Sequence, residues 1–469
     1  MSGSVSRGAA IVAAVTLVAA CSSGGDGTGV GVRPPPVPSR AESGGATSVF
    51  DATISAFAQP ARNLGAGERR DFATGNNFFN DAWVIAPSST TGRDGLGPTF
   101  NATSCSGCHF KDGRAAPPAP GENGPGLLFR LSVPGAGARG EPLVEPTYGD
   151  QLQPQAVPGV PAEGKVEISY AEVEGRMADG TPYTLQRPTY TLVPALGPVA
   201  PGTMLSPRVA PAIVGMGLLE AVPEANVTAR ADAGDGDGDG ISGRPNRVWN
   251  SSTQRVELGR FGWKANQPTV DQQVAGAFVG DIGITSRLSP VQNCPPPQAL
   301  CAAAPSGGEP ELDDLKLDRV TFYSRTLAVP ARRDVADPVT ARGAATFASL
   351  GCSSCHTPSM RTGASPIPAL ADQEIQPFSD LLLHDMGPDL ADDRPDFEAS
   401  GTEWRTPPLW GIGLVETVNG HTRFLHDGRA RSLEEAVLWH GGEGEAARRR
   451  YTELPAPERA ALLTFLRSL

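Results

Sequence analysis

The sequence predicts a mainly α-helical protein built from two related domains, with long Pro/Gly-rich loops and a β-hairpin inserted in the first domain. Three observations predict this fold class: a short motif that occurs twice, an internal repeat that covers both halves, and helical patterning near the C-terminus. The motif is Cys-x-x-Cys-His, at residues 105–109 and 352–356. The 56 glycines and 45 prolines among 469 residues imply that much of the chain forms loops.

Cys-x-x-Cys-His is the attachment sequence for c-type haem. The two thiols bind the haem covalently, and the adjacent histidine reaches the iron from one face. A structural zinc site would need four ligands, with no requirement for a histidine after the second cysteine in both copies. We therefore expect two covalently bound c-type haems in two cytochrome c-like haem domains. The expected haem-binding residues are Cys105, Cys108, His109, Cys352, Cys355 and His356, with His109 and His356 as iron ligands.

The N-terminus is typical of an exported protein. Arg7 precedes an apolar run over residues 9–20 that ends at Cys21 and is too short to span a bilayer as a mature helix. The run resembles a bacterial lipoprotein signal, which implies cleavage before Cys21 and lipidation of that cysteine. An ordinary secretory signal is the alternative. We expect a periplasmic lipoprotein anchored to the membrane through Cys21, organised as signal peptide 1–20, flexible tether 21–49, N-terminal haem domain with insertions 50–330 and C-terminal haem domain 331–469.

Charge and cysteine content limit the other possibilities. The net charge of −12 argues against a nucleic-acid partner. Of seven cysteines, Cys21 and the four haem thiols leave Cys294 and Cys301. In an oxidising compartment these two are expected to form a local disulfide.

Regular elements are predicted at a few places only. Residues 165–177 and 183–193 alternate apolar and polar side chains around Asp179-Gly180, which predicts a hairpin. Residues 114–163 are Pro/Gly-rich and expected to be irregular. Residues 433–439 and 458–469 are the clearest helical stretches.

The internal repeat relates the two halves. Residues 405–416 align with residues 208–220, with one inserted residue. Residues 423–426 align with 260–263 and residues 432–437 with 269–274, at an offset of 426 − 263 = 163. A phenylalanine also lies five residues before each motif, at Phe100 and Phe347. The motifs themselves are 352 − 105 = 247 residues apart, so the first half carries the longer insertions.

Several blocks resemble known haem proteins. Residues 424–428, 433–437 and 440–441 resemble the C-terminal haem domain of bacterial di-haem cytochrome c peroxidases. Residues 97–114, 208–244, 258–285 and 403–444 are similar to the di-haem oxidoreductase family, peroxidase-like proteins sometimes labelled thiol oxidoreductases. The resemblance implies a haem-dependent oxidoreductase that acts on peroxide or a small oxidisable substrate, with a redox partner protein such as a cytochrome or cupredoxin. The alternative is a non-catalytic di-haem electron carrier, a lipid-anchored subunit of a larger redox or metal-uptake assembly.

The resemblance also suggests how the two haems differ. In the peroxidases the position after the helix at 433–437 supplies the second ligand of the C-terminal haem, usually methionine; here it is His440, with Met386 as the competing ligand. The aligned position, 440 − 163 = 277, is alanine, which cannot coordinate iron. We therefore expect an electron-transfer haem at His356 and an open, catalytic haem at His109.

Cleavage of peroxide needs a group that moves a proton between its oxygens. Asp281 and Gln273 lie close to where the resembling peroxidases place a distal carboxylate and glutamine, and Glu220 is the second carboxylate candidate. Each could instead be an ordinary capping or surface residue. Trp263 aligns with His426 and is expected to be an electron relay or a core residue. His426 is expected to form hydrogen bonds near the second haem, and His384 and His421 have no predicted role.

Asp235, Asp237 and Asp239 alternate with glycines in a pattern typical of calcium loops. The twelfth position is Asn246 rather than the glutamate of an EF-hand. The sequence therefore favours a simpler Asp-rich Ca²⁺ loop, with a solvated acidic turn as the alternative.

Overall fold

A computed structural model describes residues 37–122 and 124–469, together with residues 1 and 3. The rest of the predicted signal segment, Cys21 and the first part of the predicted tether lie outside the described residues. Within the described residues, no helix is both long enough and apolar enough to cross a membrane.

The last part of the predicted tether packs against the folded unit. Ser43, Thr47 and Ser48 are buried, and the Ser43 carbonyl oxygen accepts a hydrogen bond of 2.7 Å from the Gln376 amide. A flexible tether would therefore end before residue 43 rather than at residue 49. The composition of this segment gives no sign of the packing, because its partners are distant in the sequence.

Strands predominate between residues 99 and 209, and helices occur in groups elsewhere along the chain. The helices are α1 (Ala66–Asn80), α2 (Met216–Glu220), α3 (Glu224–Thr228), α4 (Val270–Ala277), α5 (Ala299–Ala302), α6 (Asp314–Thr326), α7 (Pro338–Ser349), α8 (Val415–Asn419), α9 (Leu433–Leu438), α10 (Glu445–Glu453) and α11 (Ala456–Ser468). The strands are β1 (Thr99–Phe100), β2 (Leu127–Ala136), β3 (Pro142–Leu143), β4 (Gln155–Ala156), β5 (Gly164–Arg176), β6 (Pro182–Pro194), β7 (Met204–Val209), β8 (Arg247–Asn250), β9 (Arg255–Leu258), β10 (Met360–Arg361), β11 (Glu374–Ile375), β12 (Leu383–Asp385) and β13 (Glu403–Arg405). Short helical turns include η2 (Cys105–Gly107), the π-helical η4 (Phe278–Ile282) and η5 (Cys352–Ser354).

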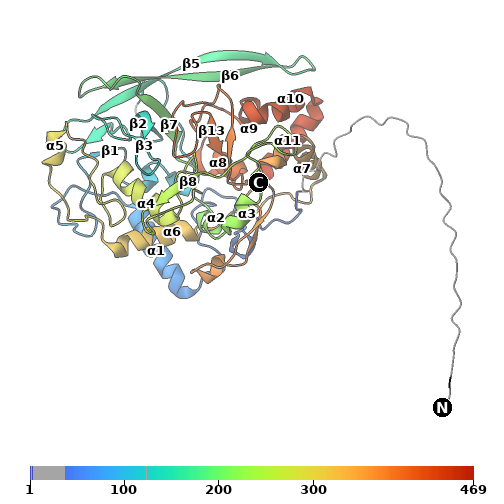
Figure 1. Ribbon diagram of the computed structural model, residues 1–469, viewed down its shortest axis with the longest axis horizontal. Coiled ribbons are helices and arrows are strands. Elements are labelled where there is room, and N and C mark those ends of the chain that lie inside the picture. The colour runs from blue at the N-terminus through green and yellow to red at the C-terminus, as the bar shows by residue number, and fades with distance from the viewer. Residues whose placement is uncertain (2, 4–36, 123) are drawn as a thin grey trace. The chain divides into compact units, whose positions relative to one another are not determined.

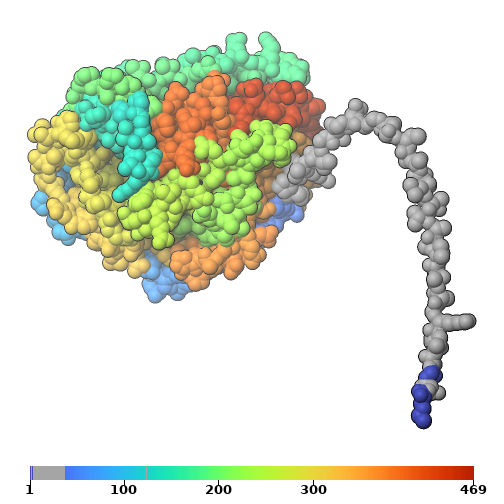
Figure 2. Space-filling view, in the orientation of Figure 1, coloured from blue at the N-terminus to red at the C-terminus, as the bar shows by residue number. Residues whose placement is uncertain are grey.

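The fold is mixed rather than mainly α. The predicted hairpin is present as β5 and β6, which pair from Gly164↔Pro194 to Arg176↔Pro182. The segment expected to be irregular also contains β2, which forms an antiparallel sheet in the order β3-β2-β7. Its third strand, β7, comes from a distant part of the chain, so local composition does not reveal the sheet. In Figures 1 and 2 the hairpin runs along one edge of the molecule, from above β2 to above α10.

The two halves contain the same crossing of two helices. In the first half α1 crosses α6, and a Cβ atom on Gly75 would overlap the Arg319 carbonyl oxygen. In the second half α7 crosses α11, and a Cβ atom on Gly343 would overlap the Ala461 carbonyl oxygen. Glycine is required at both crossings because the backbones approach too closely for any side chain. The matched crossings support the predicted relation between the halves.

The repeat is also visible at the start of two helices. Thr269 begins α4 and accepts a hydrogen bond of 3.2 Å from the Gln272 amide. Ser432, its aligned residue, begins α9 and accepts one of 3.1 Å from the Glu435 amide. Hydroxyl N-caps satisfy backbone N–H groups that have no partner within the helix. The aligned residues Thr269 and Ser432 are therefore N-caps of equivalent helices in the two halves.

A phenylalanine packs on each motif histidine. The Phe347 ring of α7 lies 6.3 Å from the His356 ring between centroids. In the first half Phe79 of α1 occupies this place, 6.1 Å from His109, whereas Phe100 lies on β1. The equal distance from the motif in the sequence therefore matched Phe100 with Phe347, whereas Phe79 is the structural counterpart of Phe347. The match fails because a long loop separates α1 from the first motif.

The hydrophobic core crosses the predicted boundary between the halves. One cluster joins Leu317 of α6 with Leu414 of the second half, and another joins Leu185 of the hairpin with Phe465 of α11. The described residues from position 37 onward belong to one compact unit. A boundary at residue 330 stays a prediction.

Candidate functional site

A continuous cavity reaches both Cys-x-x-Cys-His motifs. Its volume is about 740 Å³, and both motif histidines line it. All four motif cysteines line it as well, and none of them is in a disulfide. Four free thiols and two histidines around one cavity fit the attachment of two haems.

His109 is held in the tautomer that an iron ligand requires. Its Nδ1 lies 2.8 Å from the Pro211 carbonyl oxygen. Because a carbonyl oxygen only accepts hydrogen bonds, Nδ1 carries the proton and Nε2 is left free for a metal. Burial lowers the pKa of His109, which keeps the ring neutral, as ligation needs.

His356 has the same arrangement in the second half. Its Nδ1 donates to the Phe378 carbonyl oxygen at 3.0 Å. Burial and the neighbouring His440 lower the pKa of His356 to about 4. Both motif histidines therefore present a free Nε2 from a fixed ring.

The His440 ring faces His356 across the second part of the cavity. Their ring centroids are 6.5 Å apart, and the His440 Nδ1 donates to the Ala436 carbonyl oxygen at 2.7 Å. Two metal–nitrogen bonds of about 2 Å, plus the distance from each ring centre to its nitrogen, would span about 6 Å. The two histidines therefore fit one iron between them. Met386, the competing ligand, also lines the cavity.

The candidate acid and amide come from one helix and its continuation. α4 carries Gln273 and Ala277, and η4 carries Asp281; all three line the cavity. The Asp281 carbonyl oxygen accepts hydrogen bonds from the amides of Asn101 (2.8 Å) and Ala102 (3.1 Å), which fixes it beside the first motif. Burial raises the pKa of Asp281. π-helical turns frequently occur at functional sites.

Glu220 is placed differently. It is not among the residues that line the cavity. Its carboxylate pairs with Arg325 at 2.6 Å and accepts a hydrogen bond of 2.8 Å from the Val270 amide, at the start of α4. The structure therefore does not bring Glu220 together with Asp281 and Gln273.

Trp263, Trp404 and His426 line the cavity. The Trp263 Nε1 donates to the Val209 carbonyl oxygen at 2.8 Å. His426 stacks on Trp404 with ring centroids 3.8 Å apart. The buried Lys264 ammonium lies 4.6 Å from the centroid of the Trp404 ring. Trp404 was not predicted from the sequence: it lies on β13 opposite His384 of β12, and its contact with His426 depends on tertiary packing.

The two histidines without a predicted role use both ring nitrogens. His384 bridges the carboxylates of Asp380 (2.8 Å) and Glu443 (2.6 Å). His421 contacts the Arg114 carbonyl oxygen at 2.9 Å and the Arg423 amide at 3.1 Å. Neither ring has a nitrogen left for a metal.

The acidic loop gathers a different set of carboxylates from the one predicted. Carboxylate oxygens of Asp232, Asp235 and Asp237 lie within 4.8 Å of one another. Asp239 is not in this group; it lines the cavity and accepts a hydrogen bond from the Ile241 amide at 2.9 Å. Asp232 lies outside the alternating Asp-Gly motif. The turn of the loop brings its carboxylate close to those of Asp235 and Asp237.

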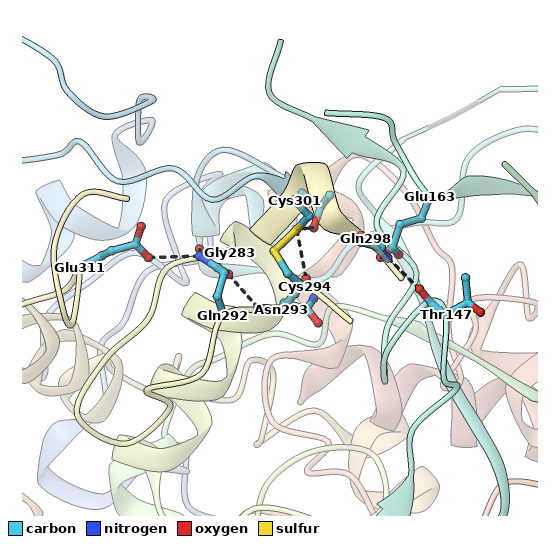
Figure 3. The surroundings of a disulfide bond; sticks show 10 residues. Thr147, Glu163, Gly283, Gln292, Asn293, Cys294, Gln298, Cys301 and Glu311 are labelled. Carbon is cyan, nitrogen blue, oxygen red and sulfur yellow. Dashed lines mark hydrogen bonds between the residues drawn. A yellow bond between two sulfur atoms is a disulfide. The ribbon is translucent and has the colours of Figure 1, made fainter. Parts of the chain in front are cut away.

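The predicted disulfide between Cys294 and Cys301 is confirmed, with its sulfur atoms 2.00 Å apart. It closes a loop whose preceding residues, 291–293, line the cavity. The Gln292 Nε2 donates to the Gly283 carbonyl oxygen at 2.8 Å, as Figure 3 shows. The disulfide therefore closes the loop next to residues 291–293, and the Gln292 hydrogen bond joins these cavity-lining residues to Gly283, which follows η4.

Comparison with protein families gives one match. The model of a family described as "Di-haem oxidoreductase, putative peroxidase" matches residues 39–127 and 202–469. No curated protein matches the chain.

Two solved structures are similar to the chain at low identity. Hydrazine synthase from Kuenenia stuttgartiensis is 14% identical, with 97% of this chain and 100% of that chain covered and a TM-score of 0.34. A MauG-like protein associated with microbial copper homeostasis is 16% identical, with 53% and 89% covered and a TM-score of 0.28. At these TM-scores neither likeness carries an argument.

Proposed function

Because the chain belongs to the di-haem oxidoreductase family, we propose that it is a c-type cytochrome that reduces peroxide, or oxidises a small organic or thiol substrate, at the haem of His109. The haem of His356 transfers electrons. The observation that carries this proposal is the difference between two aligned positions. His440 faces His356 at 6.5 Å between ring centroids, whereas Ala277 lines the cavity at the aligned position. One iron would have two protein ligands and the other an open position.

The residues of the two motifs would hold the haems. Cys105 and Cys108 bind the first covalently, Cys352 and Cys355 bind the second, and each motif histidine ligates one iron. When bound, a haem with an open position binds peroxide and supplies electrons for cleavage of the O–O bond. The protein contributes fixed imidazole rings, since each Nδ1 is held by a backbone carbonyl oxygen.

Reduction of peroxide to two water molecules takes up two electrons and two protons, so the cavity must supply protons. Asp281 lines the cavity, and burial raises its pKa, so its carboxyl can exchange a proton nearer to neutral pH. Gln273, two helical turns earlier, can hold the substrate by hydrogen bonds. Glu220 instead accepts a hydrogen bond from the Val270 amide at the start of α4 and is held by an ion pair with Arg325 of α6.

The proposal includes export and a redox partner. A periplasmic lipoprotein anchored through Cys21 would receive its electrons from a soluble carrier such as a cytochrome or cupredoxin. The Cys294–Cys301 disulfide supports an oxidising compartment.

The acidic loop is proposed to bind Ca²⁺ through Asp232, Asp235 and Asp237. Three carboxylates within 4.8 Å of one another offer the oxygen ligands that Ca²⁺ prefers.

Mixing the purified holoprotein with peroxide and a reductant tests the function. The wild type is expected to turn over peroxide, and Asp281→Asn is expected to slow it by about 10²- to 10⁴-fold while both haem spectra stay nearly intact. Glu167→Gln is the control, since it removes an exposed carboxylate on β5 that does not line the cavity. If the wild type does not react with peroxide in any redox state, a non-catalytic electron carrier replaces this proposal.

A further inference from the structure

The segment from residue 128 to residue 201 lies outside the part of the chain that matches the family model, yet it forms a wall of the cavity next to Asp281. Its first strand, β2, carries Arg130, which forms a bridge with Gln151. Two backbone hydrogen bonds join β2 to residues 150–152: the Leu131 amide donates to the Asp150 carbonyl oxygen at 2.8 Å, and the Leu152 amide donates to the Phe129 carbonyl oxygen at 3.0 Å. This packing brings Arg130 and Gln151 to η4.

Gln151 is completely buried and contacts the Asp281 carboxylate. Its Nε2 lies 2.8 Å from Asp281 Oδ1, 2.9 Å from the Gly280 carbonyl oxygen and 2.5 Å from Asn101 Oδ1. An amide nitrogen has two hydrogens for these three acceptors. The side chain is therefore held in one place, and the Asp281 carboxylate is held with it.

Arg130 places a positive charge beside the same carboxylate. It lines the cavity and pairs with Asp150 at 2.5 Å. A Cβ atom on Gly280 would lie 3.9 Å from the Arg130 Nη2, so the guanidinium packs on the residue before Asp281. Although burial opposes the charge, Asp150 and Asp281 raise the pKa of Arg130, and the side chain stays cationic.

We propose that Arg130 and Gln151 complete the peroxide site: Gln151 is a positioning residue for Asp281, and Arg130 supplies the positive charge that stabilises a bound anion or the departing oxygen. This inference rests on the proposed function. In the reaction Asp281 takes a proton from one peroxide oxygen and returns it to the other as the O–O bond breaks. Arg130 stabilises the negative charge that develops on the leaving oxygen before this proton arrives, and that oxygen departs as water. Two electrons, delivered one at a time by a one-electron carrier protein, and two further protons from solvent release the other oxygen as a second water molecule.

Fluoride binding gives a test that does not depend on turnover. Fluoride is a small anion that binds an open ferric haem, and its binding is followed in the optical spectrum of the resting holoprotein. Arg130→Met is expected to weaken fluoride binding and to slow a single turnover with peroxide, each by about 10- to 100-fold. Arg130→Lys should recover part of both. Arg247→Met is the matched control, since Arg247 also pairs with a carboxylate at 2.5 Å but does not line the cavity.

Gln151→Leu tests the positioning role. The charged groups that face Asp281 are Arg130 and Asp150; Cys105 and Cys108 also lie near it but have no ionisable thiol once the haem is attached. Loss of the Gln151 hydrogen bond removes a stabilisation of the ionised carboxylate, so the rise of the single-turnover rate with pH should move to higher pH.

The outcomes separate this inference from the proposed function. A wild type that binds neither fluoride nor peroxide refutes the proposed function. A wild type that reacts, with a haem-loaded Arg130→Met variant that keeps the fluoride affinity and the peroxide rate of the wild type, refutes the role of Arg130. An unchanged pH profile in folded Gln151→Leu refutes the role of Gln151.

Discussion

Glu163→Gln should remove a pH dependence of stability, so that the variant gains stability relative to the wild type as the pH rises. Glu163 is completely buried, and its carboxyl accepts hydrogen bonds of 2.6 Å from the Gln153 amide and from the Gln298 side chain. Burial outweighs these hydrogen bonds and raises the pKa of Glu163 from 4.5 to about 8. The neutral acid is therefore the form that the fold accommodates. Figure 3 shows Glu163 and Gln298 near the disulfide.

The sign of the effect follows from proton binding. Between about pH 4.5 and about pH 8 the folded state keeps the Glu163 proton and the unfolded state loses it, so stability falls as pH rises across this window. The shift from 4.5 to about 8 corresponds to roughly 5 kcal/mol at most. Dividing this free energy by the unfolding entropy expected for a chain of this size gives a change in Tm of about 5 °C.

Thermal unfolding of the holoprotein at several pH values measures the effect. The Tm of Glu163→Gln minus that of the wild type should grow by up to about 5 °C between pH 5 and pH 8. Glu167→Gln, at an exposed position on β5, should show no such growth. A Tm difference that is the same at pH 5 and pH 8 would refute the reasoning, because it would mean that Glu163 does not retain its proton in the folded state.

Three further predictions concern other parts of the molecule. Gly343→Ala should destabilise the protein by about 1–3 kcal/mol or more in thermal melts, because the new methyl group overlaps the Ala461 carbonyl oxygen; Gly67→Ala, which meets nothing closer than 3.8 Å, should be neutral or stabilising. Asp237→Asn should lower both Ca²⁺ content and Tm, and an equal Tm of the wild type with and without chelator would remove the calcium site. His440→Ala should add a second high-spin haem and slow electron delivery in stopped-flow reduction; an unchanged spectrum would leave Met386 as the ligand.

The sequence predicted the features that depend on local patterns. The Cys-x-x-Cys-His motifs, the hairpin around Gly180 and the helix at residues 433–438 are each encoded within a few residues. The Cys294–Cys301 disulfide followed from counting cysteines in a chain predicted to be exported. Alignment of the two halves also related His440 to Ala277, because residues at equivalent positions of a repeat can be identified from the sequence alone.

Features that depend on contacts between distant segments could not be predicted in this way. Arg130 and Gln151 face each other in an isolated β-bridge and reach Asp281 from a distant part of the chain, and the contact of Trp404 with His426 also depends on tertiary packing. Glu220 looked like a candidate acid, but its partner Arg325 comes from α6. The signals for these contacts are weak: an alternation of apolar and polar residues in β2, and single polar residues in Pro/Gly-rich stretches.

The spin states of the two irons test the central claim most directly. Electron paramagnetic resonance of the resting holoprotein, recorded with the optical spectrum, should show one low-spin centre with two histidine ligands and one high-spin centre of equal amount. The low-spin signal should be lost in His440→Ala and kept in Asp281→Asn. Two low-spin centres in the wild type, in both the oxidised and the half-reduced protein, would contradict an open iron at His109 and the function proposed from it.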